Sequence, residues 1–234
     1  CQKFEARSSH YFVRMGLFKL LNIPSDIIIK EHEPAGRFIP LTQIRTSAEL
    51  TSFIIDMIPL LHLEAEQAKT LGYIVSELVR NVLEHAEAAN GALLCAQYYK
   101  KSNSIRIGIA DTGLGIKATI TRSHRADSDL DAIRLALMPG ITGTTRREGG
   151  TEQNAGAGLF FIKSIASVNR DYFVIYSGTG FYKLLKKVSA RNLRLHADPF
   201  MDRYTSDGEM PAWHGTVVGV DISLDQTEEF SRLL

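Results

Sequence analysis

The sequence predicts an α/β fold with helices and strands in mixed order. Segments with apolar residues at helical spacing lie between short runs rich in β-branched and aromatic residues. Their order lacks the regular strand–helix alternation of a doubly wound parallel sheet. Hydrophobic residues make up 44% of the 234-residue chain and charged residues 23%, so we expect a globular protein with a sizeable core.

The first residues predict a short helical segment. Apolar residues recur at roughly helical spacing within residues 1–23, and a strand candidate follows at 27–30. The polar stretch 31–36, which contains proline and glycine, marks a domain boundary. We therefore expect an N-terminal helical segment at 1–35, either an appended helix or the tail of a truncated upstream regulatory domain, and a second domain at 36–234.

The first half of the second domain predicts strands and two long helices. Thr46 or Ser47 is suited to cap the first helix, and Pro59 weakens its end. The second helix has the longest uninterrupted apolar pattern in the chain. The expected elements are strands at 38–44, 92–99 and 105–110 and helices at 47–61 and 64–86.

The second half predicts a long loop, a hairpin and a final strand. Residues 139–156 have the composition of a loop, rich in glycine and threonine. The run Gly178-Thr179-Gly180 is expected to turn a hairpin. The expected elements are helices at 129–138 and 157–168 and strands at 172–177, 181–188 and 216–222.

Charge and cysteine content exclude several classes of function. Lys and Arg total 27 and Asp and Glu total 26, so the formal net charge of +1 indicates no nucleic-acid surface. No apolar run approaches the roughly 20 residues that cross a bilayer. Cys1 and Cys95 have no metal-ligand spacing. We therefore expect a cytoplasmic protein.

The longest helix carries a polar row. Glu77, Asn81 and His85 are spaced i, i+4 and i+8, so they lie on one face, whereas the other positions nearby are largely apolar. Buried polar groups need partners, and an amide oxygen beside a carboxylate suits Mg²⁺ with its water shell. The alternative is a solvated stripe on an amphipathic helix.

A carboxylate and two glycines follow one of the strands. Asp111 ends the strand, and Gly113 and Gly115 permit tight turns of the backbone close to a ligand. Asp111 is placed to accept a hydrogen bond from an exocyclic amine. The alternative is a plain Asp-Thr-Gly turn. An aspartic-protease site is excluded because the sequence has no second copy of this motif.

A glycine-rich loop runs directly into the next helix. Gly156 and Gly158 open it, and their backbone N–H groups together with the helix N-terminus make an anion site. The spacing matches neither the dinucleotide-binding fingerprint nor the Walker loop. The alternative is a flexible loop with an ordinary capping glycine.

The order of the three motifs resembles the GHKL superfamily. Glu-x-x-x-Asn on a helix, a strand pair ending in Asp-x-Gly-x-Gly, and a loop with Gly-x-Gly-Leu opening a helix are similar to the ATP-binding domain of gyrase, ninety-kilodalton heat-shock chaperones, histidine kinases and MutL. The resemblance covers roughly residues 36–224. It implies a Bergerat-type fold, a two-layer α/β sandwich with a mixed sheet and helices on one face.

The resemblance implies roles for the first two motifs. Asn81 corresponds to the Mg²⁺ ligand, and Glu77 to the carboxylate that activates the attacking water or hydroxyl. Asp111 corresponds to the carboxylate that recognises adenine, with Gly113 and Gly115 as the first glycine box.

It also implies roles further along the chain. Gly156 and Gly158 correspond to the second glycine box beside the phosphates, and residues 117–155 to the ATP lid. Lys163 is a candidate phosphate contact, and Thr216 resembles the hydroxyl residue that assists the adenine carboxylate through water.

Two features bear on the subfamily. Family members often have glycine after the leucine of the second box, where this chain has Phe160. His85 has a counterpart in bacterial anti-sigma-factor serine kinases, which favours that subfamily. The alternative for His85 is a satisfied helix histidine.

The implied cofactors are ATP and Mg²⁺, and the implied partner is another protein or a second copy of the chain. Three functions compete: a slow ATPase or ATP-gated switch, a protein serine kinase, and a non-catalytic nucleotide-gated module for protein interaction. Intact Glu77 and Asn81 favour the first two. We therefore expect a Mg²⁺-dependent ATP-binding domain that acts as an ATP-hydrolysing or phosphotransferring signalling switch.

Overall fold

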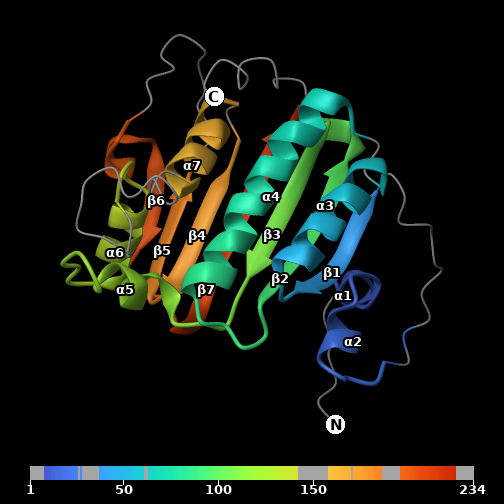
Figure 1. Ribbon diagram of the computed structural model, residues 1–234, viewed down its shortest axis with the longest axis horizontal. Coiled ribbons are helices and arrows are strands. Elements are labelled where there is room, and N and C mark those ends of the chain that lie inside the picture. Colours follow the sequence, from blue (N-terminus) through green and yellow to red (C-terminus); the bar gives the residue numbers. More distant parts are fainter. Residues whose placement is uncertain are drawn as a thin grey trace.

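The fold is a sheet with a layer of helices on one face (Figure 1). The computed structural model describes residues 8–25, 27, 37–60, 63–141, 158–169, 171–185 and 196–224. Three helices, α3, α4 and α7, cover one face of a seven-stranded sheet with the order β1-β2-β3-β7-β4-β5-β6. The predicted two-layer α/β architecture is confirmed.

The sheet is antiparallel in every pairing among its described strands, so the prediction of a mixed sheet was wrong in this detail. Antiparallel neighbours can be joined by tight turns, and short connections of this kind link β2 to β3 and β4 to β5. The last strand enters the middle of the sheet between β3 and β4. The strands are β1 (Phe38–Ile44), β2 (Ala92–Tyr99), β3 (Ser104–Ala110), β4 (Phe173–Gly178), β5 (Gly180–Leu184), β6 (Tyr204–Asp207) and β7 (Trp213–Ser223).

The helices that follow residue 36 lie close to their expected positions, and one is additional. The helix α5 follows the first glycine box and was not predicted, and neither was the short, polar strand β6. The helices are α3 (Ser47–Leu60), α4 (Ala65–His85), α5 (Gly115–Ile120), α6 (Asp129–Ala136) and α7 (Gly158–Val168), with short 3₁₀ turns η1 (Lys100–Ser102) and η2 (Pro199–Met201).

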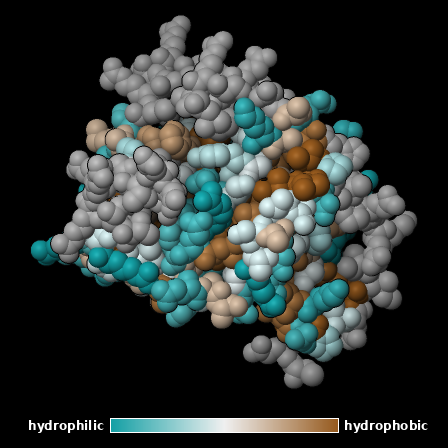
Figure 2. Space-filling view, viewed as in Figure 1, coloured by the Kyte–Doolittle hydropathy of each residue, from teal (hydrophilic) through white to brown (hydrophobic). Residues whose placement is uncertain are grey.

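Buried and exposed side chains alternate along the central strands, so the two faces of the sheet have different surroundings. In β3, Ile105, Ile107 and Ile109 are buried in the core beneath the helices, whereas Arg106 is exposed on the opposite face. On the helical side, hydrophobic side chains gather over α3 and α4, and hydrophilic ones over α5 and the loop that follows it (Figure 2). None of the described helices is long and apolar enough to cross a membrane.

The first two helices, α1 (Ser9–Arg14) and α2 (Leu17–Leu20), lie beside β1. Met15 and Phe18 are buried, and the backbone N–H of Leu41 in β1 donates to the carbonyl of Met15 at 2.8 Å. Tyr11 of α1 also borders a hollow of about 620 Å³ on the sheet face opposite α4. The strand candidate at 27–30 lies outside the described residues except for its first residue, which is not in a strand.

Candidate functional site

The helix α4 positions the first motif. Its N-terminus is closed by a reciprocal capping box between Glu64 and Gln67, which satisfies two backbone donors that would otherwise be unpaired. Glu77 and Asn81 follow on the outer part of the helix, and both are half-buried. Burial raises the pKa of the Glu77 carboxyl above its usual 4.5, although nearby Arg80 acts in the opposite direction. Such a carboxylate is a better proton acceptor than a fully solvated one.

Glu77 lies against the start of α7. A Cβ built on Gly158, the first residue of α7, would collide with Oε2 of Glu77. Only glycine therefore fits at this position while the carboxylate remains where it is. The structure thus brings Glu77 together with Gly158 of the predicted second glycine box. Gly156, the other glycine of that box, lies outside the described residues.

The second motif is built around Asp111, which is only 3% exposed. Its Oδ1 accepts a hydrogen bond from the backbone N–H of Gly113 at 2.7 Å. Burial raises the pKa of the Asp111 carboxyl, while the backbone N–H groups of Gly113 and Thr216 counteract this effect. The backbone N–H of Asp111 donates to the carbonyl of Thr216 at 2.9 Å, so these two predicted site residues are direct neighbours.

The C-terminal end of α4 connects the first motif to the second. The carbonyl of Ala86 accepts a hydrogen bond from Leu114 N–H at 2.8 Å, and a Cβ on Gly113 would collide with that same carbonyl. Gly115 adopts a left-handed conformation, with φ of +79°, where a residue with a side chain would be strained. Gly113 therefore allows the first box to pack directly onto the end of α4, whereas Gly115 faces Ser177 and Gly215.

Ser177 holds several parts of the site together and was missed from the sequence. Its hydroxyl accepts from Ile116 N–H at 2.9 Å, donates to the carbonyl of Gly215 at 2.8 Å, and lies 3.2 Å from the Thr216 hydroxyl. Ser177 is paired with Thr216 across β4 and β7. The sequence contains no signal for this contact, because it depends on β7 entering the sheet beside β4.

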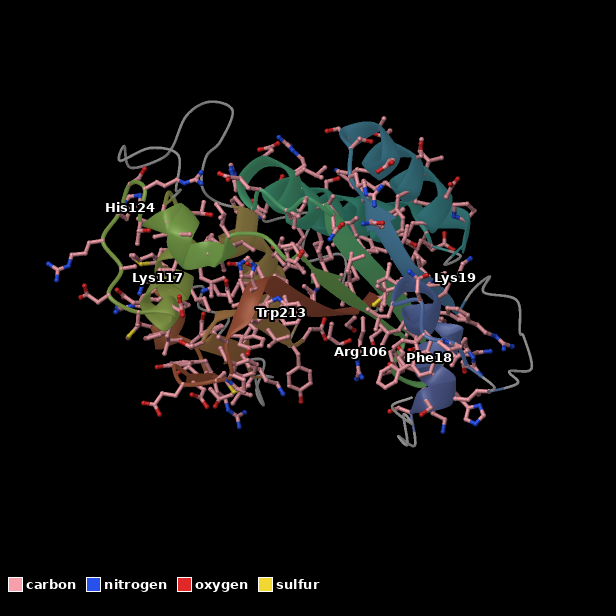
Figure 3. The ribbon with its side chains drawn as sticks, turned by 90° about the horizontal axis from the view of Figure 1, so that it is seen from below. Phe18, Lys19, Arg106, Lys117, His124 and Trp213 are labelled. Carbon is pink, nitrogen blue, oxygen red and sulfur yellow. The ribbon has the colours of Figure 1, made fainter. Side chains whose placement is uncertain are left out.

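Trp213 and His214 were also missed. The indole N–H of Trp213 donates to the carbonyl of Asp111 at 3.2 Å, and Nδ1 of His214 lies 3.2 Å from the carbonyl of Thr112. Trp213 lies between the α5–α6 end of the molecule, marked by Lys117 and His124, and the α1–α2 end, marked by Phe18 (Figure 3). Both side chains thus fasten β7 to the turn that follows Asp111.

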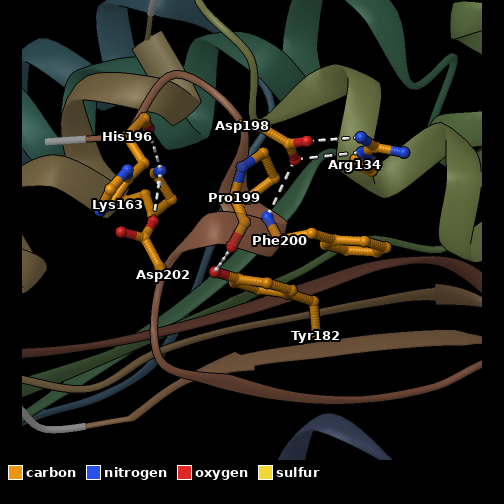
Figure 4. Close-up of polar contacts among 8 residues, drawn as sticks. All are labelled: Arg134, Lys163, Tyr182, His196, Asp198, Pro199, Phe200 and Asp202. Carbon is orange, nitrogen blue, oxygen red and sulfur yellow. Dashed lines mark hydrogen bonds and ion pairs between the residues drawn. The ribbon is translucent and has the colours of Figure 1, made fainter.

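Lys163 is not among the residues that the structure gathers around Glu77. Its ammonium group is buried, bonded to Oδ2 of Asp202 at 2.7 Å and to the carbonyl of His196 at 2.9 Å (Figure 4). These bonds leave it no role as a phosphate contact in this conformation, so we treat Lys163 as a structural residue. The sequence could not reveal its partner, which lies 39 positions away.

The predicted lid falls partly within the described residues. In its first part, 117–141, α6 is anchored by Asp129, whose carboxylate accepts from the N–H and the hydroxyl of Thr179 at 2.9 and 3.0 Å. The rest, 142–155, lies outside the described residues.

The comparison with known families decides the assignment. A model of the histidine kinase-like ATPase domain matches residues 43–172, which include Glu77, Asp111 and Gly158. The chain belongs to the histidine kinase-like ATPase domain family. No curated protein is significantly similar to the chain. Membership of this family supports ATP binding.

Within the described part of the chain, no group of three or more His, Cys, Asp or Glu side chains is arranged to hold a metal. Mg²⁺ is commonly bound by one or two protein ligands together with substrate phosphates. The Asn81 amide oxygen, one turn after Glu77, fits a site of that kind, in which the phosphates supply further ligands.

Proposed function

We propose that residues 36–234 form a Mg²⁺-dependent ATP-binding domain that hydrolyses ATP or transfers its terminal phosphoryl group in signalling. The contact between Glu77 and Gly158 supports this proposal most directly. The Glu77 carboxylate, whose pKa is raised, lies beside the first residue of α7, where any side chain would collide with it. The N-terminus of a helix favours anions.

Each motif has a separate task in this proposal. Asp111 accepts a hydrogen bond from the exocyclic amine of adenine, assisted by the Thr216 hydroxyl. Asn81 holds Mg²⁺, which would neutralise charge on the phosphates. Glu77 accepts the proton of the attacking water or hydroxyl. Gly158 leaves room for that carboxylate, and the second glycine box, Gly156 and Gly158, lies beside the phosphates. Phosphoryl transfer depends mainly on such positioning and charge stabilisation.

The proposed setting is a cytoplasmic signalling protein that acts on a protein partner or on a second copy of itself. His85, the last residue of α4, remains the reason to favour a relationship to anti-sigma-factor serine kinases. The second candidate function is a non-catalytic module that binds nucleotide and alters a protein surface. The described part of the predicted lid, which is docked through Asp129, is compatible with either function.

Incubation with γ-labelled ATP and Mg²⁺ tests the proposal. We expect free labelled phosphate, or labelled protein, to accumulate with wild-type chain. Glu77→Gln should abolish most of this product while nucleotide binding continues. Binding without either product would favour the non-catalytic module, and the absence of binding to a folded sample would contradict both functions.

A further inference from the structure

The segment 198–202 is bonded to side chains from several elements. At its first residue, both carboxylate oxygens of Asp198 accept from the guanidinium of Arg134 in α6, and the Nε bond is 3.1 Å long (Figure 4). This bond lowers the pKa of the Asp198 carboxyl. Oδ1 of Asp198 also accepts from the N–H of Phe200 at 3.0 Å, which caps η2.

At its other end, the segment is bonded to α7. Oδ2 of Asp202 accepts from the ammonium group of Lys163 at 2.7 Å, and both side chains are almost completely buried. Removing either partner would leave an uncompensated charge in the interior. The position of α7 is therefore coupled to that of Asp202.

The sheet fixes the middle of the segment. The hydroxyl of Tyr182 in β5 donates to the carbonyl of Pro199 at 3.0 Å. The ring of Phe200 stacks on those of Tyr182 and Tyr204, with centroids 6.2 and 4.9 Å away. The Arg134 guanidinium lies 5.1 Å from the centre of the Phe200 ring. A segment held on this many sides has little freedom to move independently.

The two ends of the segment lead to different halves of the proposed site. On one side, α6 packs against α5 around Ile120 and Ala132, and α5 begins at Gly115 in the first glycine box. On the other side, α7 begins at Gly158, against Glu77.

We propose that the segment 198–202 sets the spacing between the adenine half and the phosphate half of the site, with Arg134 and Asp198 as positioning residues. This inference rests on the proposed function, because it assigns the two halves to base and phosphates. A ligand that occupies both halves senses their spacing, whereas a ligand that occupies one half does not.

A comparison of adenosine binding with MgATP binding therefore distinguishes the positioning role of the segment from a general effect on the stability of the fold. Adenosine contacts only the half around Asp111, whereas MgATP also reaches Asn81 and Gly158. Loss of the Arg134–Asp198 ion pair should raise the Kd for MgATP about fivefold or more and leave the Kd for adenosine unchanged. General destabilisation of the fold would affect both ligands alike.

The test uses the full chain with Arg134→Met, Asp198→Asn and the double variant. Asp198→Asn keeps an oxygen that can cap Phe200 while removing the charge. The matched control is Arg106→Met, which removes an ion pair with Asp221 on the sheet face opposite the helices without touching the segment. Calorimetric titration with MgATP and with adenosine is combined with thermal unfolding of each variant.

We expect each single variant to weaken the binding of MgATP and not that of adenosine. The double variant should bind MgATP no more weakly than either single variant, and Arg106→Met should bind both ligands as the wild type does. The inference is overturned if the single variants bind MgATP as the wild type does, or if they weaken the binding of adenosine as much as that of MgATP. It is also overturned if the losses of MgATP affinity in the two single variants add up in the double variant. A wild-type chain that binds neither ligand overturns the proposed function itself, which is a different result from any of these.

Discussion

The carboxylate of Glu77 lies directly against Gly158, so the middle of α4 and the first residue of α7 meet at one point. These residues are far apart in sequence and belong to two of the motifs that indicated a nucleotide site. Their contact means that a change at the glycine acts on the carboxylate.

Gly158→Ala should therefore lower turnover with little loss of stability. The atom that a new Cβ would meet is the end of the flexible Glu77 side chain, which can rotate away. Alanine is also a better helix former than glycine. Phosphate release and melting temperature, measured on the same sample, check this.

Gly113→Ala provides the matched contrast. Its new Cβ would meet the backbone carbonyl of Ala86, which cannot rotate away, so this variant should lose stability. If Gly158→Ala lowers the melting temperature as much as Gly113→Ala does, the contact with Glu77 is tighter than we infer.

Glu77→Gln should lower turnover by about 10²–10⁴-fold if Glu77 is the general base. It should also stabilise the protein at neutral pH. Burial raises the pKa of this carboxyl above 4.5 in the folded state, so ionised Glu77 disfavours the fold once the pH exceeds that pKa. The gain in melting temperature should be present at pH 7 and vanish towards pH 4, where the wild-type carboxyl is also neutral.

Glu84→Gln, at a more exposed position on the same helix, is the control for this prediction. It should leave turnover unchanged. Wild-type turnover in Glu77→Gln would remove Glu77 from the mechanism, whatever its effect on stability.

Asn81→Ala should remove the Mg²⁺ dependence of nucleotide binding. Asn81 supplies the amide oxygen that we assign to the metal, so the affinity for ATP in excess Mg²⁺ should fall to that measured with a chelator. Titrations with a fluorescent ATP analogue in both conditions check this. If Mg²⁺ strengthens binding to the variant as much as to the wild type, another residue holds the metal.

Lys163→Met should destabilise the protein by about 3–5 kcal/mol, because it leaves the carboxylate of Asp202 buried and unpaired. Urea unfolding measures the loss. Arg80→Met, which removes an exposed ion pair with Glu84, should cost about 1 kcal/mol or less. A Lys163→Met variant that keeps its stability but loses ATP affinity would return Lys163 to the phosphate site.

Local patterns predicted most of the fold. The apolar period of α4 and the alternating isoleucines of β3 predicted the bounds of both elements closely, because burial of one face produces a regular pattern of apolar residues. The helix α5 was missed because it starts within a glycine motif, and β6 because it is short, polar and at the edge of the sheet. The mixed sheet was an error of strand direction, which residue patterns do not determine.

The local contacts of the candidate site were predictable where its residues form contiguous motifs. Asp111 and Gly113 are two residues apart, and the hydrogen bond between them follows from that spacing. Ser177, Asp198 and Asp202 were not predictable, because each acts through a partner that only the tertiary fold brings near. For the same reason, the sequence could not show that Lys163 is bonded to Asp202 and lies outside the site.

The central claim is that the chain binds ATP through Asp111, and calorimetric titration with MgATP and MgGTP tests it most directly. Guanine presents a carbonyl where adenine presents its amine, which would leave the buried carboxylate unpaired. We predict saturable binding of ATP, at least about tenfold tighter than that of GTP, and a severe loss of ATP affinity in Asp111→Asn. Equal affinities for the two nucleotides, or no saturable ATP binding by a folded sample, would contradict the account.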